Sequence, residues 1–368
     1  MIERPEYIQQ ITPFAGKKII KVLVGVRRCG KSTLLDLLRE QLQREHLAGD
    51  NLLHMRFESE QFTHIDTDDK LASYVREHVD RTKPVTLLFD EIQEVDHWER
   101  ALRSFLVDYD ADIYITGSNA RVLSSDLATY ITGRYVTINV YPLSFKEFLP
   151  AFQSSHPDSD VRGAFRGYVA QGGFPFQHEL EFAQDPTLHY LQDLTSTILL
   201  KDVVRRNAIR DVDLLERLVR YAIAEEGHPL TPNAIASYLK SERRKTSQET
   251  VSNYLNAVAK AYLLYRVPRI DAVGKRALQF NEKYYVVDQG IRQALGYDNT
   301  ANIDQTLENI VCMELLRRGY AVSVGAVGDK EIDFVASRGG VREYYQVSYL
   351  TGDERTRERE LSPLEAIP

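Results

Sequence analysis

Apolar and polar positions alternate in blocks through the first 142 residues. Apolar, β-branched runs occupy 18–24, 85–89, 111–116 and 135–141, which predicts buried strands. The segment 32–39 has leucines at helical spacing and predicts an amphipathic helix. Alternating strands and helices indicate an α/β domain built on a mostly parallel sheet that is covered on both faces. Ligands of such sheets bind at the carboxyl ends of the strands.

The first predicted strand leads directly into a glycine-rich loop. The loop reads Gly25-Val26-Arg27-Arg28-Cys29-Gly30-Lys31-Ser32, followed by Thr33 at the start of the helix. It fits G-x-x-x-x-G-K-[ST], a loop whose backbone N–H groups surround phosphates. Lys31 would neutralise the β- and γ-phosphates and Ser32 would hold Mg²⁺. The alternative is a chance match in a surface turn, but the flanking strand and helix favour an ATP site.

The strand that begins at residue 85 ends in two carboxylates, Asp90 and Glu91. Beside a phosphate loop, Asp90 would join the Mg²⁺ shell and Glu91 would orient and deprotonate the attacking water. Adjacent acids at a strand end also occur for solubility alone. Their spacing after a complete phosphate loop favours the catalytic interpretation.

Two further polar features follow later strands. Asn119, or its neighbour Ser118, follows the strand 111–117 and would reach the γ-phosphate or the water, the alternative being a simple turn. Arg134 precedes the strand 135–141 and would act across a subunit boundary as an arginine finger, or else form a structural ion pair. We expect all four features to meet at the carboxyl edge of one sheet.

Together these motifs resemble a widespread group of prokaryotic AAA+ ATPases with a C-terminal domain of unknown function. The resemblance covers nearly the whole chain and rests on Gly25–Ser32, Leu87–Gln93, Thr116–Asn119, Gly133-Arg134 and Pro142–Phe148. It implies that Lys31 and Ser32 are Walker A residues, Asp90 and Glu91 the Walker B pair, Asn119 or Ser118 sensor 1, and Arg134 the candidate finger. It also implies ATP and Mg²⁺ as ligands and a homo-oligomer.

Three predicted segments follow the core at 1–142. Residues 143–207 have helical patterning interrupted at Gln171–Pro175, where Gly-Gly and Pro favour a turn; in AAA+ proteins a helical lid follows the core, and this segment fits one. Residues 208–270 indicate a winged helix, with Thr231 before Pro232 at one helix start and a capping box at Thr246–Glu249 at the next.

The second helix of the winged-helix segment supplies candidate DNA contacts. Basic residues precede this helix, and polar residues lie on its predicted outer face. The candidates are Arg243, Arg244, Lys245, Gln248 and Asn253. The alternative is a winged helix that packs against protein.

The last segment, 271–368, resembles the restriction-endonuclease-like fold. Glu308 on a predicted helix, Asp333 on one strand and Gln346 on the next follow that fold's order of metal-binding residues. Ser348 occupies the position of the fold's lysine, and Lys330 falls on the face opposite Asp333. We therefore predict a nuclease-derived, inactive and truncated α/β module.

Composition and net charge argue against several classes of protein. The chain has 368 residues, a net charge of −7 and two cysteines, which argues against coating nucleic acid over the whole surface and against a disulfide framework. No apolar run approaches the roughly 18 residues of a membrane span, so we expect a cytoplasmic protein with no membrane partner. Three functions remain: an ATPase that acts on DNA or moves its C-terminal module, a slow nucleotide-gated switch that binds a protein, and an ATP-gated Mg²⁺-dependent nuclease.

Overall fold

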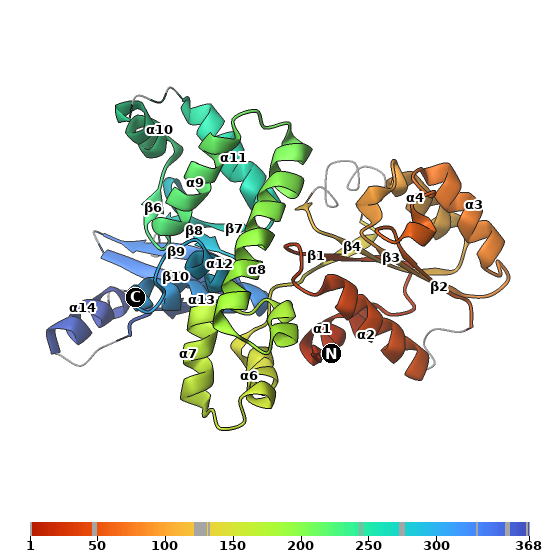
Figure 1. Ribbon diagram of the computed structural model, residues 1–368, viewed down its shortest axis with the longest axis horizontal. Helices are drawn as coiled ribbons and strands as arrows, with labels where there is room; N and C mark the ends of the chain where they lie inside the picture. The colour runs from red at the N-terminus through yellow and green to blue at the C-terminus, as the bar shows by residue number, and fades with distance from the viewer. Residues whose placement is uncertain are drawn as a thin grey trace. The chain divides into compact units, whose positions relative to one another are not determined.

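The computed structural model describes residues 2–45, 50–120, 131, 133–242, 244, 246–271, 277–328, 330–349, 354–365 and 367. The chain divides into two compact units, 1–141 and 142–368, whose elements are labelled in Figure 1. Among the described residues, no helix is long and apolar enough to cross a bilayer.

The first unit contains a parallel sheet of five strands in the order β2-β3-β4-β1-β5. The strands are β1 (Ile20–Val24), β2 (Leu52–Arg56), β3 (Val85–Asp90), β4 (Ala111–Gly117) and β5 (Tyr135–Asn139). Every residue of β1, β3 and β4 is buried, as expected for central strands covered on both faces. The four predicted strands are therefore confirmed. The edge strand β2 was not predicted from the hydrophobic pattern; it is mostly half-buried and carries His54 and Arg56.

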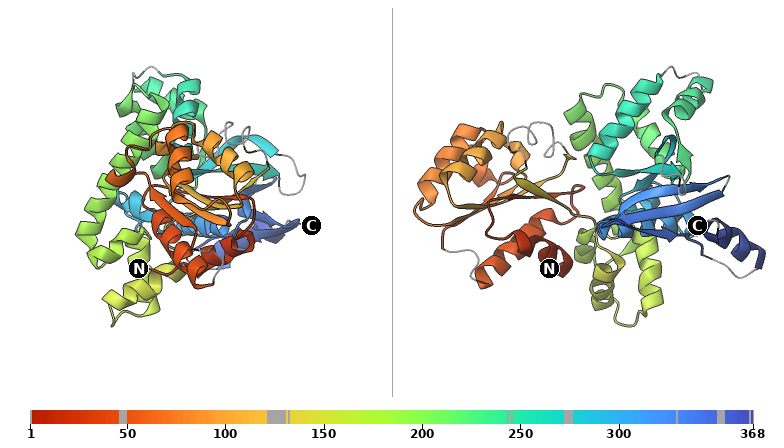
Figure 2. Two further views of the ribbon diagram at one scale, coloured as in Figure 1. Left: turned by 90° about the vertical axis from the view of Figure 1, so that its right-hand side faces the viewer. Right: turned by 180° about the vertical axis from the view of Figure 1, so that it is seen from behind.

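Helices cover both faces of this sheet, as Figure 2 shows. They are α1 (Pro5–Ile11), α2 (Lys31–Arg44), α3 (Asp68–His78) and α4 (Trp98–Asp108), with short 3₁₀ turns at Thr12–Phe14, Glu60–Phe62 and Ile92–Glu94. The predicted amphipathic helix is α2, which buries Leu34, Leu35, Leu38 and Leu42. The α/β architecture of this unit is thus the one that the hydrophobic pattern predicts.

The second unit begins with helices. They are α6 (Phe145–Ser155), α7 (Val161–Gln171) and α8 (Gln184–Thr197), which continues into the π-helix η6 (Ile198–Arg205); a 3₁₀ segment spans Pro175–Leu180. The predicted interruption after Gln171 is confirmed. Gly172 has φ 76°, and a Cβ there would lie 1.8 Å from the Asp288 carboxylate, so this turn requires glycine.

A mixed sheet of six strands forms the rest of the second unit, in the order β11-β10-β9-β7-β8-β6. The strands are β6 (Pro229–Leu230), β7 (Leu264–Asp271), β8 (Ala277–Val286), β9 (Ala321–Val327), β10 (Lys330–Arg338) and β11 (Val341–Tyr345). Only the pairing of β7 with β9 is parallel among these described pairs. The predicted boundary at 270/271 falls inside β7, which pairs with β8 and β9, so one sheet continues across it.

The helices of this region are α9 (Val212–Ala224), α10 (Pro232–Ser241), α11 (Gln248–Lys260), α12 (Gln289–Ala294), α13 (Ile303–Arg317) and α14 (Glu354–Glu365). Thr231 caps α10 as predicted, accepting a hydrogen bond from the Ala234 N–H. The predicted capping box at Thr246–Glu249 is wrong. The cap of α11 is Ser247, whose hydroxyl accepts the Thr250 N–H at 3.0 Å, so Glu249 lies one position too early to close a box.

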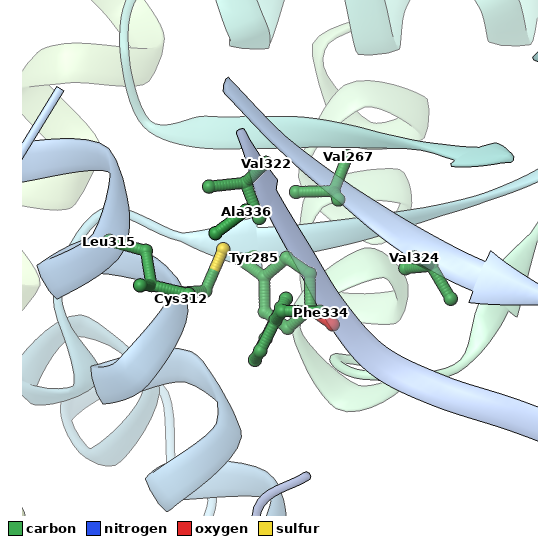
Figure 3. Packing of buried hydrophobic residues seen from close by; sticks show 8 residues of the cluster. All are labelled: Val267, Tyr285, Cys312, Leu315, Val322, Val324, Phe334 and Ala336. Atoms are coloured by element: carbon green, nitrogen blue, oxygen red, sulfur yellow. The ribbon is translucent and has the colours of Figure 1, made fainter. Parts of the chain in front are cut away.

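An apolar core joins the six-stranded sheet to α13, and Figure 3 shows its packing. Its buried members come from β7, β8, β9, β10 and α13: Val267, Tyr285, Cys312, Leu315, Val322, Val324, Phe334 and Ala336. The predicted helix with Glu308 and the predicted strand with Asp333 are confirmed. Gln346 was predicted on the next strand, but β11 ends at Tyr345 and leaves Gln346 and Ser348 beyond it.

Candidate functional site

The glycine-rich loop connects the carboxyl end of β1 to the first turn of α2. Gly30 is the N-cap of α2 with φ 99°, a left-handed conformation that favours glycine. A Cβ on Gly25 would lie 2.0 Å from the Val140 carbonyl oxygen, so only glycine permits this approach of loop and strand end. The loop therefore ends at a helix N-terminus, where N–H groups favour an anion.

Lys31 is a buried cation in this loop. Its ammonium donates to the carbonyl oxygens of Gly25 and Val26, both at 3.1 Å, and lies 3.8 Å from Glu91 Oε1. The ammonium is therefore held by the loop itself, and the Glu91 carboxylate lies at the outer limit of an ion pair. A phosphate at the loop would meet an ammonium that no carboxylate has tightly bound.

Ser32 and Asp90 bring two oxygen atoms together beside the loop. The Ser32 hydroxyl donates to Asp90 Oδ1 at 3.1 Å, and the Thr116 hydroxyl donates to the same oxygen at 2.6 Å. Burial raises the pKa of Asp90, and these two hydrogen bonds oppose the rise. A hydroxyl and a carboxylate are hard oxygen ligands and fit Mg²⁺. No described group of three His, Cys, Asp or Glu side chains could hold a metal ion, so Mg²⁺ here would also need phosphate oxygens.

Glu91 lies next to Asp90 with a left-handed φ of 54°. Burial acts to raise the pKa of its carboxyl, but the Lys31 charge and a hydrogen bond from Gln93 outweigh this and lower it. Glu91 is therefore a carboxylate at neutral pH, as a general base must be. Of the two sensor candidates, Ser118 is fully buried, and its hydroxyl has no hydrogen-bond partner among the described residues. Asn119 is buried at the end of β4, and its contact with a γ-phosphate stays a prediction.

Thr116 links the two acids and was given no role in the sequence interpretation. Besides donating to Asp90, its hydroxyl accepts the Glu91 N–H at 2.8 Å. The side chain is fully buried at the carboxyl end of β4, which pairs with β3. A hydroxyl at the end of the strand next to the paired acids was the available signal. Thr116 thereby fixes the positions of both acidic residues.

Arg4 is a second residue that sequence reasoning missed. Its buried guanidinium donates to the Cys29 carbonyl oxygen at 3.0 Å and to the Tyr141 carbonyl oxygen at 2.9 Å. The Tyr7 hydroxyl accepts the Tyr141 N–H at 3.0 Å. The segment before β1 therefore stabilises the loop through the hydrogen bond to the Cys29 carbonyl oxygen, and no motif in the sequence indicates this role.

The remaining residues of the loop differ in burial, in their contacts and in backbone conformation. Cys29 is buried, burial raises the pKa of its thiol, and its sulfur donates to the Val140 carbonyl oxygen at 3.2 Å. Val26 is buried. Arg27 pairs with Glu58 at 3.4 Å, and Arg28 has a left-handed φ of 66°.

Arg134 does not join the other features, and the expectation that it meets them at one edge is wrong. It is exposed and precedes β5, whose first residue pairs in parallel with Ile20 at the start of β1. The loop follows the opposite end of β1. Arg134 therefore lies at the amino edge of the sheet, because the polar group precedes its strand instead of following it. Its role as a finger toward a neighbouring subunit stays a prediction.

The second unit brings together the residues of the predicted vestigial nuclease site. Gln346 Oε1 accepts the Asp333 N–H at 3.3 Å, and Asp333 Oδ2 accepts the Val347 N–H at 2.8 Å. Burial and the nearby Glu308 charge raise the pKa of Asp333 to about 7. The sequence therefore located this cluster, although Gln346 lies beyond β11 and not within a strand.

A lysine that the sequence interpretation missed lies in the same cluster. Lys283, on β8, places its ammonium 3.0 Å from Glu308 Oε1 and 2.7 Å from Glu331 Oε1. The Tyr285 hydroxyl donates to the same Glu308 oxygen at 2.5 Å. Burial acts to lower the pKa of Lys283, but the two carboxylates outweigh it and raise it. A lysine directly before the apolar run 284–287 was the signal, since a buried lysine needs buried partners.

The candidate DNA contacts differ in whether they pair with acidic side chains or are exposed. Arg244 pairs with Asp213 and lies 3.6 Å from Asp211 at the start of α9. Gln248 and Asn253 are exposed on α11. Arg243 and Lys245 lie outside the described residues.

Residues 17–149 match the AAA domain family, and residues 162–305 match a domain of unknown function (DUF8612). An uncharacterised protein of Haemophilus influenzae is 38% identical over 351 residues, which cover 95% of this chain and 87% of that protein. One from Methanocaldococcus jannaschii is 31% identical over 359 residues, covering 94% and 78%. A Walker-type ATPase of Pyrococcus abyssi shares the fold with a TM-score of 0.57 at 16% identity, over 80% of this chain and 96% of that one.

Proposed function

The chain belongs to the prokaryotic P-loop ATPases whose AAA domain precedes a domain of unknown function, and from this premise we propose that it hydrolyses ATP with Glu91 as the general base. The carrying observation is that Lys31, Ser32, Asp90 and Glu91 form one contact network at the carboxyl edge of the sheet. Such a network supplies phosphate binding, a cation site and a base together.

Each residue of the network has a distinct part in the proposed reaction. The loop N–H groups and Lys31 bind the β- and γ-phosphates, while Ser32 and Asp90 hold Mg²⁺. Bound Mg²⁺ offsets the negative charge of the phosphates. Glu91 accepts the proton of the attacking water, and Gln93 orients its carboxylate. Asn119 contacts the γ-phosphate, and Arg134 of one subunit serves the site of the next in a homo-oligomer.

Steady-state phosphate release by the wild type and Glu91→Gln tests this proposal. Loss of the base lowers the rate about 100-fold or more, while binding of a fluorescent ATP analogue persists. Glu94→Gln is the matched control, because it makes the same change three residues away at an exposed position. Equal rates for the wild type and Glu91→Gln would refute the role of Glu91.

We further propose that ATP hydrolysis by this chain is coupled to DNA. Gln248 and Asn253 are exposed on α11, where they are available to a nucleic acid. Single- or double-stranded DNA added to the phosphate-release assay accelerates hydrolysis if the chain acts on DNA. A slow rate that is indifferent to DNA favours the alternative, a nucleotide-gated switch for a protein partner.

The nuclease alternative is disfavoured by Lys283. A divalent cation between Glu308 and Asp333 would have to displace an ammonium already bonded to Glu308 and Glu331. Ser348 also lacks the charge of the fold's lysine. The cluster therefore does not fit Mg²⁺, and we expect no Mg²⁺-dependent DNA cleavage that Asp333→Asn abolishes.

A further inference from the structure

A polar groove of about 520 Å³ lies in the second unit, between the segment that precedes α9 and one face of α11. Helix α11 packs against both η6 and α9, so the groove follows a junction between helices. Its lining residues are Asn207, Ala208, Ile209, Arg210, Asn253, Tyr254, Asn256, Ala257 and Lys260. The volume falls within the range of ligand sites.

The α11 residues that line the groove form one stripe of the helix. Asn253, Asn256 and Lys260 follow helical spacing and are exposed. Val251, Leu255 and Val258 lie on the buried side of the helix. The sequence therefore divides α11 into a packing face and a polar face, and the polar face borders the groove.

The lining is cationic and contains no carboxylate, although the chain as a whole has a net charge of −7. Four of its side chains, Arg210, Asn253, Asn256 and Lys260, take part in no hydrogen bond or ion pair with another described residue. Arg244, in contrast, is held by Asp211 and Asp213. The groove thus presents two cationic and two amide side chains that make no hydrogen bond or ion pair with another described residue.

We propose that this groove binds the phosphodiester backbone of a nucleic acid, with Arg210 and Lys260 on phosphates and the two asparagines on phosphate or base edges. Guanidinium and ammonium groups bind phosphate oxygens, and amides both donate to and accept from base edges. An acidic peptide would use the cations but not the amide stripe, which is why nucleic acid is the better occupant. The inference deepens the proposed coupling to DNA and moves its phosphate contacts from Arg244 to Arg210 and Lys260.

Fluorescence anisotropy with a labelled DNA duplex and the corresponding single strand tests the proposal on the full chain. In Arg210→Ala/Lys260→Ala the dissociation constant rises about tenfold, and the slope of log K against log salt falls by about 2, for two lost phosphate contacts. Asn253→Ala/Asn256→Ala weakens binding and leaves the salt slope unchanged. The duplex and the single strand together show which form the groove takes.

Lys330→Ala/Arg342→Ala is the matched control, because it removes two exposed positive charges elsewhere in the second unit. Equal weakening by both double variants would overturn the proposal, since binding would then follow net charge alone. Failure of the wild type to bind DNA, or binding of polyglutamate in its place, would also overturn it. Basal phosphate release without DNA stays at the wild-type rate in the groove variant, so a failure of this inference is distinct from a failure of the ATPase.

Discussion

Lys31 and Lys283 are both only 3% exposed, and both face carboxylates, yet their surroundings suit opposite purposes. The Lys31 ammonium is held by two loop carbonyl oxygens and has Glu91 at 3.8 Å. The Lys283 ammonium lies between two carboxylates at 3.0 and 2.7 Å. A buried cation bonded mainly to carbonyls retains its charge for an incoming anion. One paired with two carboxylates has already been neutralised.

The comparison explains why similar residues suit the proposed active site in one unit and a structural cluster in the other. Beside Lys31, the Asp90 carboxylate accepts hydrogen bonds from the Ser32 and Thr116 hydroxyls and is paired with no ammonium among the described residues, so it suits a cation that arrives with a nucleotide. Around Lys283, Glu308 is already bonded to the ammonium and to Tyr285. Whether a buried lysine near acidic residues can bind an anion therefore depends on whether its ammonium is bonded to carbonyl oxygens or to carboxylates.

The largest expected effect comes from Lys31→Ala. Removing the ammonium takes away the charge that stabilises the transferred phosphate, so phosphate release falls about 100- to 1,000-fold. The fold should persist, because the hydrogen bonds of the lysine go to loop carbonyls and the Glu91 carboxylate lies 3.8 Å away. Phosphate release and circular dichroism measured on the same preparation check both statements. A variant that unfolds would show that Lys31 is structural in the way Lys283 is.

Lys283→Met should show the reverse pattern. It removes the cation paired with Glu308 and leaves Glu331 paired with Arg269 at 3.5 Å, and the free energy of unfolding of the second unit falls by about 3 kcal/mol. Urea denaturation measures the loss, and hydrogen exchange in β8 and β10 assigns it to this unit. Adding Glu308→Gln to the same chain should recover part of the loss. Unchanged stability in Lys283→Met would refute the structural role of the cluster.

Thr116→Val tests how strictly the first site depends on positioning. The hydroxyl that joins Asp90 to the Glu91 backbone is lost while the side-chain volume is kept, and kcat falls about tenfold, equivalent to about 1.4 kcal/mol. Thr116→Ser keeps the hydroxyl and should retain most of the rate. If both variants lose activity equally, the methyl packing of Thr116 matters and its hydrogen bonds do not.

The smallest effect expected is a pH dependence from Asp333. Its pKa is raised from 3.8 to about 7 in the folded chain, so the stability it contributes is complete below pH 4 and is lost as the pH rises through 7. Asp333→Asn removes this loss and should be more stable than the wild type by about 1 kcal/mol at pH 8, after allowance for partial exposure. The difference should shrink toward pH 5. Melting temperatures across this range measure it, and a constant difference would contradict the raised pKa.

The sequence predicted those parts of the molecule that depend on local pattern. Continuous apolar runs identified β1, β3 and β4, because central parallel strands are buried on both faces. The loop motif located Lys31 and Ser32, since phosphate binding constrains consecutive residues. The edge strand β2 was not predicted, because its half-buried pattern mixes apolar and polar residues.

What the sequence did not predict depends on contacts between distant residues. Arg4 reaches Cys29 and Tyr141, and Lys283 reaches Glu308, across separations that no local spacing encodes. The direction of β5 placed Arg134 at the far edge, which follows from strand pairing and not from its motif. Residues that stabilise a site, or neutralise its charge, from distant positions in the sequence are thus harder to predict than those that form its motif.

Manganese binding, measured by electron paramagnetic resonance with and without a non-hydrolysable ATP analogue, tests the contrast between the two lysines most directly. The account predicts no tight Mn²⁺ site in the chain alone and one per chain with the analogue, which Asp90→Asn removes and Asp333→Asn leaves intact. A tight Mn²⁺ site without nucleotide that disappears in Asp333→Asn would contradict it, because the Lys283 cluster would then be the metal centre.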